Sequence, residues 1–381
     1  MRSEDFSPDA PGELFAISVN GAPMWSFAPR ALPPAWDLDI AVVNRLVAAE
    51  RAMGELNGLA QQLPNPFLLI NPYIRREAVA SSRIEGTRTD LRELLLFEAD
   101  ARTAESADDA NEVENYVTAL QYALGKPKGR AISLSLIREM HQLLMDGVRG
   151  SDKRPGQFRP AQVFISSRSA REARFIPPPP DMVEPLMRDL EAFIVAESPL
   201  PQLVRIAMIH YQFEAIHPFL DGNGRTGRLL ISMLLSEWNI LAQPILLLSE
   251  FFERHRRDYV DGLLGVSLRG EWNEWTEYFL DGVIEQAHEG TRQGRSILEL
   301  RERYRKKYQS ERSIRLLPLI DQLFMRPVFT AAQLSESLGW PRYSVQRLVD
   351  PLVTEGVLEE TTGNRRNRIF LAPEIMRLLE D

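Results

Sequence analysis

The chain has 381 residues, of which 44% are hydrophobic and 26% charged, and its net charge is -8. The length suggests two or three domains, and the composition is typical of a globular protein with a large core. The sequence has no cysteine, which excludes a disulfide framework, a thiolate zinc site and a cysteine nucleophile. Because it has neither a run of 18 apolar residues nor a signal pattern at its start, we expect a cytoplasmic protein with no membrane contact. The acidic balance means that any contact with nucleic acid would need a local basic patch.

The periodicity of the apolar residues predicts an all-α protein for most of the chain. The first ~35 residues are rich in proline and turn formers, and we expect them to be irregular. Amphipathic helices are predicted over residues 38–63, 71–97, 110–124, 133–145 and 182–196. Residues 203–216 and 228–238 are apolar on nearly all sides, which predicts a buried central pair of helices. A long helical pair is expected from residue 271 to 307, and its end at 292–315 is basic.

Two segments break the helical pattern. Residues 162–166 and 174–176 flank a polar turn, which predicts a short β-hairpin with exposed edges. From residue 314 the predicted order is helix, short helix, turn, second helix and a basic hairpin tip. This order is that of a winged helix-turn-helix domain.

Parts of this C-terminal segment carry side chains that could contact a phosphate backbone. They are Arg342, Tyr343, Ser344, Gln346 and Arg347 on the second helix, and Asn364, Arg365, Arg366 and Arg368 at the hairpin tip. However, residues 316–381 hold seven arginines against nine acidic side chains. Because a DNA-binding domain normally has a clearer basic surface, protein docking or dimerisation is favoured here, and DNA binding is the alternative.

The most unusual local sequence is HPFLDGNGRTGR at residues 217–228, between the two buried helices. It contains the dinucleotide-binding pattern GxGxxG, but that motif requires a preceding strand, and here a helix precedes it. Its DGNGR segment begins like a calcium-binding loop but has an arginine where an oxygen ligand belongs. The segment does not contain the P-loop pattern either. These three generic interpretations are therefore excluded.

The same loop has the backbone features of an anion-binding site. Pro218 disfavours helical geometry at His217, so the preceding helix should end at about Ile216. The next helix begins almost at once, and its first N–H groups then point into the loop. The glycines that allow tight turns and close approach to a ligand are Gly222, Gly224 and Gly227.

Charged and titratable side chains complete this predicted site. Arg225 and Arg228 lie three residues apart on the first turn of the second helix, so both can bind phosphate oxygens. Asp221 is the one carboxylate in the loop, and beside phosphates its natural partner is Mg²⁺. His217 is the only group in the loop that can accept a proton near neutral pH. The residues therefore predict phosphoryl or nucleotidyl transfer from a magnesium-bound nucleotide to an acceptor that His217 deprotonates.

Residues 217–228 also match H-P-F-x-[DE]-G-N-G-R-x-x-R at every defined position, and in this motif the chain resembles the Fic (filamentation induced by cAMP) family. The resemblance implies a Fic helical bundle that transfers AMP from ATP, with Mg²⁺, to a Ser, Thr or Tyr hydroxyl of a target protein. It implies His217 as the general base and Asp221 as the Mg²⁺ ligand. The ATP- and phosphate-binding residues that it implies are Gly222, Asn223, Gly224, Arg225, Gly227 and Arg228.

A second motif lies upstream of the loop. Residues 81–86 (SSRIEG) resemble the inhibitory motif [ST]-x-x-x-E-[GN] of many Fic proteins. Ser81 and Glu85 stand at i and i+4, which places them on one face of a helix, and Gly86 suits the C-terminal end of that helix. The resemblance implies autoinhibition, in which Glu85 binds Arg228 and displaces it from the γ-phosphate.

The predicted hairpin corresponds in position to the flap that precedes the motif in Fic proteins. An extended segment of a target protein could add to its edge at Val163, Phe164 and Ile165 and thereby present a hydroxyl to His217. Fic proteins with an inhibitory helix and a C-terminal winged helix resemble this chain over most of its length. As a class they form homodimers, which we take as the expected state.

These observations predict four regions: an N-terminal helical region with the inhibitory helix (1–108), a Fic catalytic core (109–290), a basic helical connector (291–314) and a winged-helix domain (315–381). Two alternatives to adenylylation remain open. The enzyme could instead remove AMP, with Glu85 positioning a water, or could transfer another phosphate-bearing group. The other alternative is a winged-helix DNA-binding regulator whose Fic domain only senses nucleotide.

Overall fold

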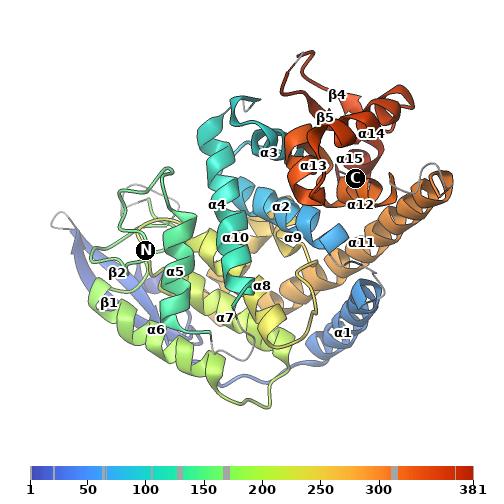
Figure 1. Ribbon diagram of the computed structural model, residues 1–381. Coiled ribbons are helices and arrows are strands. Elements are labelled where there is room, and N and C mark those ends of the chain that lie inside the picture. Colours follow the sequence, from blue (N-terminus) through green and yellow to red (C-terminus); the bar gives the residue numbers. More distant parts are fainter. Residues whose placement is uncertain are drawn as a thin grey trace. The chain divides into compact units, whose positions relative to one another are not determined.

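The computed structural model describes residues 2–19, 22–61, 65, 67–103, 106–126, 132–165, 172–309, 316–364 and 366–380. These residues are mainly helical, as the sequence predicts (Figure 1). They form two compact units. The first unit contains residues 1–53, 115–240 and 248–285, and the second contains 54–114, 241–247 and 286–381. No helix of the described ranges is long and apolar enough to cross a membrane.

The first ~35 residues are not irregular throughout, and the prediction was wrong for the two strands within residues 12–29. Strands β1 (Gly12–Val19) and β2 (Ala22–Pro29) form an antiparallel ribbon in which Gly12 pairs with Pro29. The prolines that suggested irregular structure are compatible with this ribbon, because both strands are edges and a missing N–H can face away from the partner. A short 3₁₀ helix, Ser3–Asp5, precedes the ribbon.

The helices of the first unit surround α7, which is buried along most of its length. As predicted, α7 and α8 form a central pair, and α7 also packs against α6, α10 and β2. Near the start of α11 the indole of Trp275 donates to the carbonyl of Ala207 across 2.9 Å, which fixes α7 against that helix. The helices are α5 (Leu134–Leu144), α6 (Pro180–Val195), α7 (Gln202–Ile216), α8 (Asn223–Glu237), α9 (Leu248–Arg254) and α10 (Arg256–Arg269). The prediction missed α9 and α10, and it started α8 five residues late.

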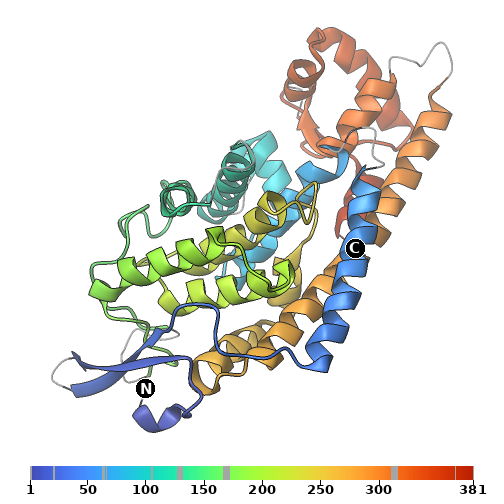
Figure 2. The ribbon, with the colours of Figure 1, turned by 90° about the horizontal axis from the view of Figure 1, so that it is seen from below.

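Three helices contribute residues to both units: α1 (Ile40–Gln61), α4 (Ala107–Leu124) and α11 (Trp272–Lys307). The sequence predicted a helical pair over the last of these, but α11 is one helix of 36 residues (Figure 2). The helix expected over 71–97 is in fact two helices, α2 (Phe67–Ile84) and α3 (Leu91–Ala99). Gly86 has a φ of 99°, which ends the first, and a capping box between Asp90 and Glu93 begins the second.

In the second unit α2 packs against α12, and α3 packs against β3. The C-terminal elements are α12 (Leu316–Met325), β3 (Val328–Thr330), α13 (Ala331–Leu338), α14 (Arg342–Thr354), β4 (Glu359–Glu360), β5 (Ile369–Leu371) and α15 (Pro373–Glu380). The three strands form an antiparallel sheet in the order β3-β5-β4. The helices and strands follow the order that the sequence predicted, whereas the winged-helix assignment stays a prediction. Residues 314, 315 and 365 lie outside the described ranges. The four predicted regions remain a prediction.

Candidate active site

The loop between α7 and α8 begins with a strained backbone at His217. Helix α7 ends at Ile216, as predicted, and His217 caps it with φ 51° and ψ 63°. This left-handed conformation costs a non-glycine residue roughly 1–2 kcal/mol, so surrounding contacts must hold it. The N–H of His217 donates to the carbonyl of Phe213 across 2.9 Å. Its half-buried imidazole has Nδ1 3.4 Å from the carbonyl oxygen of Glu214.

Arg159 supplies much of the support for this backbone. Its side chain is only 2% exposed, and the guanidinium bonds to carbonyl oxygens. Nε donates to His217 across 2.8 Å, and Nη2 donates to Pro178 across 2.6 Å. Nη1 donates to Ala161 across 3.1 Å, and the backbone N–H donates to Pro218 across 2.9 Å. Burial lowers the pKa of Arg159 to about 10, so it still carries its charge at neutral pH.

We call residues 161–178, which include the predicted flap, the flap segment. Arg159 therefore joins the backbone of His217 to both ends of this segment. Ala161 stands where the chain enters this segment, and Pro178 stands where it leaves. The sequence analysis assigned no role to Arg159. Hydrogen bonds to backbone carbonyls do not require particular residue types as partners. The sequence therefore offered no signal beyond an arginine next to the predicted flap.

The flap segment itself is less regular than predicted. Ile165 and Phe175 form an isolated antiparallel bridge, with Ile165 N–H 3.0 Å from the carbonyl of Phe175. Val163 and Phe164 are half-buried and belong to no strand. Residues 166–171, which include the predicted turn, lie outside the described ranges. The predicted pair of strands is thus reduced to a single bridge among the described residues.

The far end of the segment is anchored to the N-terminal ribbon. Phe27 of β2 donates its N–H to the carbonyl of Ile176 across 2.9 Å. The hydroxyl of Ser26 donates to the carbonyl of Pro177 across 2.7 Å. The ribbon that the sequence analysis missed therefore positions the flap segment.

The side chain of Asn223 closes the loop onto itself. Its Oδ1 accepts the N–H of Phe219 across 2.8 Å, and its Nδ2 donates to the carbonyl of the same residue across 2.9 Å. The side-chain amide of Asn223 therefore shapes the loop, and the role of this residue in binding phosphate stays a prediction. Gly222, at φ 75°, is the N-cap of α8, as its predicted turn requires.

His141 on α5 supports the loop from the other side. Its ring stacks on Phe219, with centroids 3.7 Å apart and planes 9° from parallel. Nδ1 accepts the N–H of Gly156 across 2.8 Å, so the proton sits on Nε2, which donates to the carbonyl of Asp221 across 2.9 Å. Burial, with help from the charge of Arg225, lowers the pKa of His141 to about 4. The sequence analysis assigned no role to His141 and missed that it holds the loop.

The carboxylate of Asp221 lies between its own loop and the segment after α5. Oδ1 accepts the N–H of Gly222 across 2.7 Å. A Cβ at Gly150, where φ is 88°, would lie 2.8 Å from Oδ2, so glycine is needed for the carboxylate to fit there. The described residues contain no cluster of three or more His, Asp or Glu that could hold a metal by itself. One half-buried carboxylate fits Mg²⁺ only if phosphate oxygens supply other ligands, which is the usual arrangement for a magnesium-bound nucleotide.

Arg225 and Arg228 begin α8, and both are 2% exposed. Nη2 of Arg225 lies 3.6 Å from the sulfur of Met145. Complete burial, with help from the charge of Arg228, lowers the pKa of His210 to about 3. Two buried cations on the first turns of one helix, beside its N-terminal N–H groups, make this end of α8 strongly favourable for an anion.

Gly227 has a packing role. A Cβ at this position would lie 2.3 Å from Oε1 of Glu214 and 3.1 Å from the ring of Phe213, both on α7. Glycine therefore allows α7 and α8 to approach closely. This position accounts for Gly227 without any contact to phosphate.

The residues of the inhibitory motif belong to the second unit, whereas the loop belongs to the first. Ser81 is fully buried on α2, and the positive φ of Gly86 ends the turn that follows the helix, as predicted. Glu85 lies one residue beyond the last helical residue of α2, so it is not on the regular helix face that the sequence suggested. The pairing of Glu85 with Arg228 stays a prediction.

Comparison with known proteins gives two adjacent family matches. A family model for the Fic/DOC family N-terminal region matches residues 43–125, and one for the Fic/DOC family matches residues 131–235. The chain is 32% identical over 207 residues to protein adenylyltransferase Fic of Culex quinquefasciatus, covering 52% of this chain and 38% of that protein. It is 27% identical over 240 residues to protein adenylyltransferase Fic of Nematostella vectensis, covering 61% and 52%. The chain thus spans about half or less of the length of these relatives.

Solved structures agree in fold. A Fic family protein from Desulfovibrio desulfuricans G20 superposes with a TM-score of 0.59 at 22% identity, covering 90% of this chain and 98% of that one. Fic-1 from Caenorhabditis elegans superposes with a TM-score of 0.50 at 20% identity, covering 68% and 73%. The motif at residues 217–228 lies within the second matched region, in the loop between two central helices. The chain belongs to the Fic/DOC family.

Proposed function

We propose that this protein transfers AMP from ATP to a Ser, Thr or Tyr hydroxyl of a target protein. The observation that carries the proposal is the α7–α8 loop, in which His217 caps the end of α7 and buried Arg225 and Arg228 lie on the first turns of α8. This arrangement joins a proton acceptor to an anion-binding site, which is what transfer from a nucleotide requires. The relatives that are named protein adenylyltransferases support the same activity.

In the proposed reaction His217 is the general base. A bond from Nδ1–H to the carbonyl of Glu214 would place the lone pair of the ring on Nε2, which is the atom that would accept the proton of the target hydroxyl. The hydroxyl oxygen then bonds to the α-phosphorus, while the bond from that phosphorus to the oxygen bridging to the β-phosphate breaks. Pyrophosphate leaves with the electron pair. AMP remains on the target as a phosphodiester.

The triphosphate would lie against the start of α8. The N–H groups of Asn223 and Gly224 and the side chains of Arg225 and Arg228 would bind the phosphate oxygens. Asp221 would hold Mg²⁺, and the metal would supply positive charge beside the phosphate oxygens. Because Arg159 and His141 fix the loop backbone, little reorganisation is needed on binding.

Three further features belong to this proposal. Ser81, Glu85 and Gly86 form an inhibitory motif in which Glu85 competes with the γ-phosphate for Arg228. An extended segment of the target docks along Val163, Phe164 and Ile165. The protein acts as a homodimer, and its C-terminal elements form a winged-helix domain.

ATP labelled at either the α- or the γ-phosphate tests the activity. Label that reaches protein from the α-phosphate, and not from the γ-phosphate, supports adenylylation, whereas label from the γ-phosphate indicates a kinase. EDTA and Asp221→Ala should each abolish most of the labelling if Mg²⁺ is bound through this carboxylate. No labelling, combined with release of AMP from a modified protein, would favour the reverse reaction and contradict the proposal.

A further inference from the structure

The basic end of α11 neutralises acidic residues of the C-terminal module, which we define as residues 316–380. Three acidic side chains of the module form ion pairs with this helix. The pairs are Arg301–Asp321 (2.8 Å), Arg303–Glu374 and Lys307–Glu355 (2.6 Å). Arg305 also reaches Asp321 across 3.2 Å. The net acidic count of the module, which argued against DNA binding, therefore includes three carboxylates that are already paired with α11.

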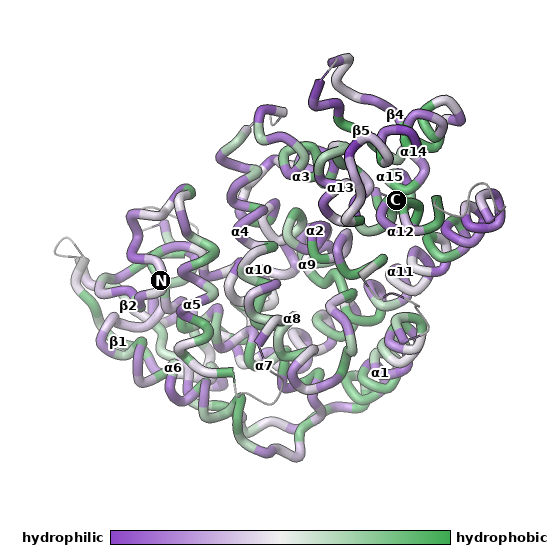
Figure 3. Tube along the Cα trace, viewed as in Figure 1, coloured by the Kyte–Doolittle hydropathy of each residue, from purple (hydrophilic) through white to green (hydrophobic). Residues whose placement is uncertain are grey.

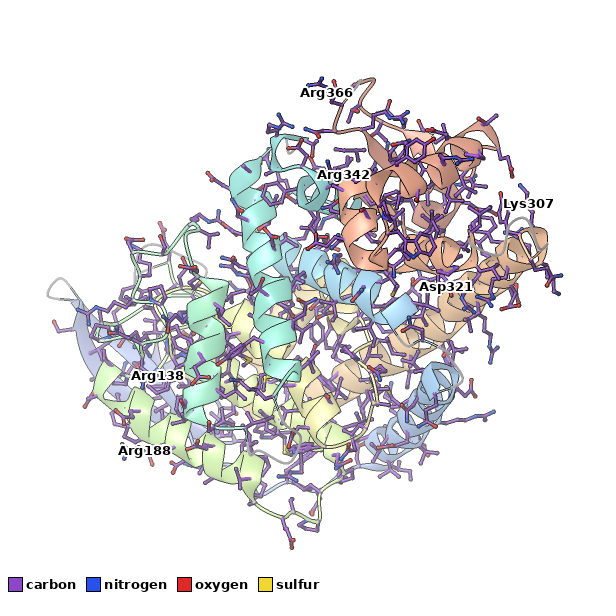
Figure 4. The ribbon with its side chains drawn as sticks, in the orientation of Figure 1. Arg138, Arg188, Lys307, Asp321, Arg342 and Arg366 are labelled. Carbon is purple, nitrogen blue, oxygen red and sulfur yellow. The ribbon has the colours of Figure 1, made fainter. Side chains whose placement is uncertain are left out.

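A groove lies on another part of the module, between α14, the segment before β5, and the start of α13. It has a volume of about 710 Å³. Its lining residues include Arg342 at the start of α14, and Arg366 and Arg368 before β5. Figure 3 shows that the residues between β4 and β5 are hydrophilic, and Figure 4 shows Arg342 and Arg366 on the C-terminal module. Three cations from two separate segments thus line one groove.

Two of these three cations face little opposing charge. Asp100 is the one acidic residue that lines the groove, and its carboxylate already accepts Nε of Arg102 across 2.9 Å. Arg368 pairs with Asp350 across 3.1 Å. Arg342 and Arg366 are exposed. Within the described part of the chain, neither guanidinium group has a hydrogen bond or an ion pair. Exposed guanidinium groups in this state bind phosphate readily, because their planar donors match its oxygens.

The helix side of the groove also carries groups that can contact bases. Tyr343 is 73% exposed, which is unusual for a large ring, and the guanidinium of Arg347 lies 5.8 Å from its centroid. Gln346 lies one turn further along α14 and lines the groove as well. Its Nε2 donates to Asp350 across 2.6 Å, and the same carboxylate oxygen accepts from Arg368. Asp350 thus holds the segment before β5 against α14.

We propose that this groove binds duplex DNA, with α14 in the major groove and residues 366–368 against the phosphate backbone. A helix start that presents Arg, Tyr and Gln, next to a cationic turn, fits this geometry. A duplex is favoured over a small anion because Arg342 and Arg366 are both exposed and come from different segments. A single phosphate there would stay largely in water, whereas a regular array of phosphates can engage both cations at once.

Fluorescence anisotropy with a labelled mixed-sequence duplex of about 24 base pairs tests this proposal on the full chain. We compare wild type with the double variant Arg342→Ala/Arg366→Ala over roughly 50 to 200 mM salt. Loss of two phosphate contacts should weaken binding at the lower salt by about tenfold or more, and should reduce the slope of log affinity against log salt by about two. The matched control is Arg188→Ala, because Arg188 is an exposed arginine of α6 with a side chain 68% accessible. Tyr343→Ala should also weaken binding, because it removes contact area without changing charge.

Each result bears on the proposal directly. Wild-type binding that falls with salt, is lost in the double variant and is kept in Arg188→Ala supports it. If Arg188→Ala weakened binding as much per charge removed as the double variant does, binding would follow total charge, and the proposal would be overturned. If the wild-type protein does not bind the duplex at about 50 mM salt, the proposal is also overturned, and a protein partner becomes the favoured occupant of the groove. The test measures DNA binding and not AMP transfer, so its result is independent of whether the protein has the proposed enzyme activity.

Discussion

Arg159 donates a hydrogen bond to the carbonyl oxygen of His217 across 2.8 Å, although 58 residues separate them in the chain. The bond fixes the backbone of a non-glycine residue in the left-handed conformation, and this residue also bears the proposed base. Because the same guanidinium binds Pro178 across 2.6 Å, movement of the flap segment and movement of the His217 backbone are mechanically linked. Docking of a target on the flap would therefore act on the position of the base.

The first prediction concerns this link. Arg159→Lys keeps the charge but replaces a planar group with several donors by a single ammonium group, which cannot span the same carbonyls. A shift of the base by about 1 Å can lower the rate of transfer roughly a hundredfold. We expect a large fall in kcat for AMP transfer with little change in ATP affinity, measured by single-turnover labelling and by nucleotide binding. Arg188→Lys serves as the control, and a wild-type kcat in Arg159→Lys would show that Arg159 is only a packing residue.

The second prediction concerns the base itself. His217→Ala should reduce AMP transfer by about 10²–10⁴-fold, because general-base catalysis typically contributes that much. ATP should still bind, because Arg225, Arg228 and the start of α8 remain in place. Labelling from α-labelled ATP and a nucleotide-binding measurement check the two parts separately. Labelling near the wild-type rate would remove His217 from the mechanism.

The third prediction concerns inhibition of AMP transfer by the inhibitory motif. Glu85→Gly should increase AMP transfer, because a carboxylate that binds Arg228 bidentately competes strongly with the γ-phosphate. Labelling at saturating ATP measures this gain, while thermal unfolding should change little. The double variant Glu85→Gly/Arg228→Ala is the control, and it should lose the gain. If Glu85→Gly labels no faster than wild type, the motif does not inhibit this protein.

The fourth prediction concerns pH and the neutral histidine beneath the loop. The pKa of His141 is about 4 in the folded protein, below the ordinary value of 6.5, so the unfolded chain binds more protons between these values. Its contribution to stability is therefore complete above pH 6.5 and is lost as the pH falls towards 4. Between about pH 7.5 and pH 5 the loss should be roughly 2 kcal/mol. Urea unfolding should show a smaller fall in stability over this range for His141→Gln than for wild type, and equal falls would contradict the assignment.

The sequence by itself determined the chemistry of the loop. Proline after His217, glycine at position 222 and two arginines three residues apart act through local geometry, and the structure has α7 and α8 meeting where these residues predict. Most helices outside the loop were also predicted, because the spacing of apolar residues marks one face of each helix. The predictions were wrong where one sequence pattern is compatible with two structures. The prolines of β2 are an example, because proline is found both in irregular segments and in edge strands.

Tertiary structure alone decided how the loop is held. Arg159 and His141 reach it by hydrogen bonds to backbone carbonyls 58 and 80 residues away, and a carbonyl is the same at every position of the sequence. The role of Gly227 was equally hidden, because a glycine that admits a ligand and a glycine that admits a neighbouring helix are identical in sequence. The ion pairs of the C-terminal module were hidden in the same way. The sequence shows how many carboxylates the module contains, but only the tertiary structure shows that Asp321 and Glu355 pair with α11.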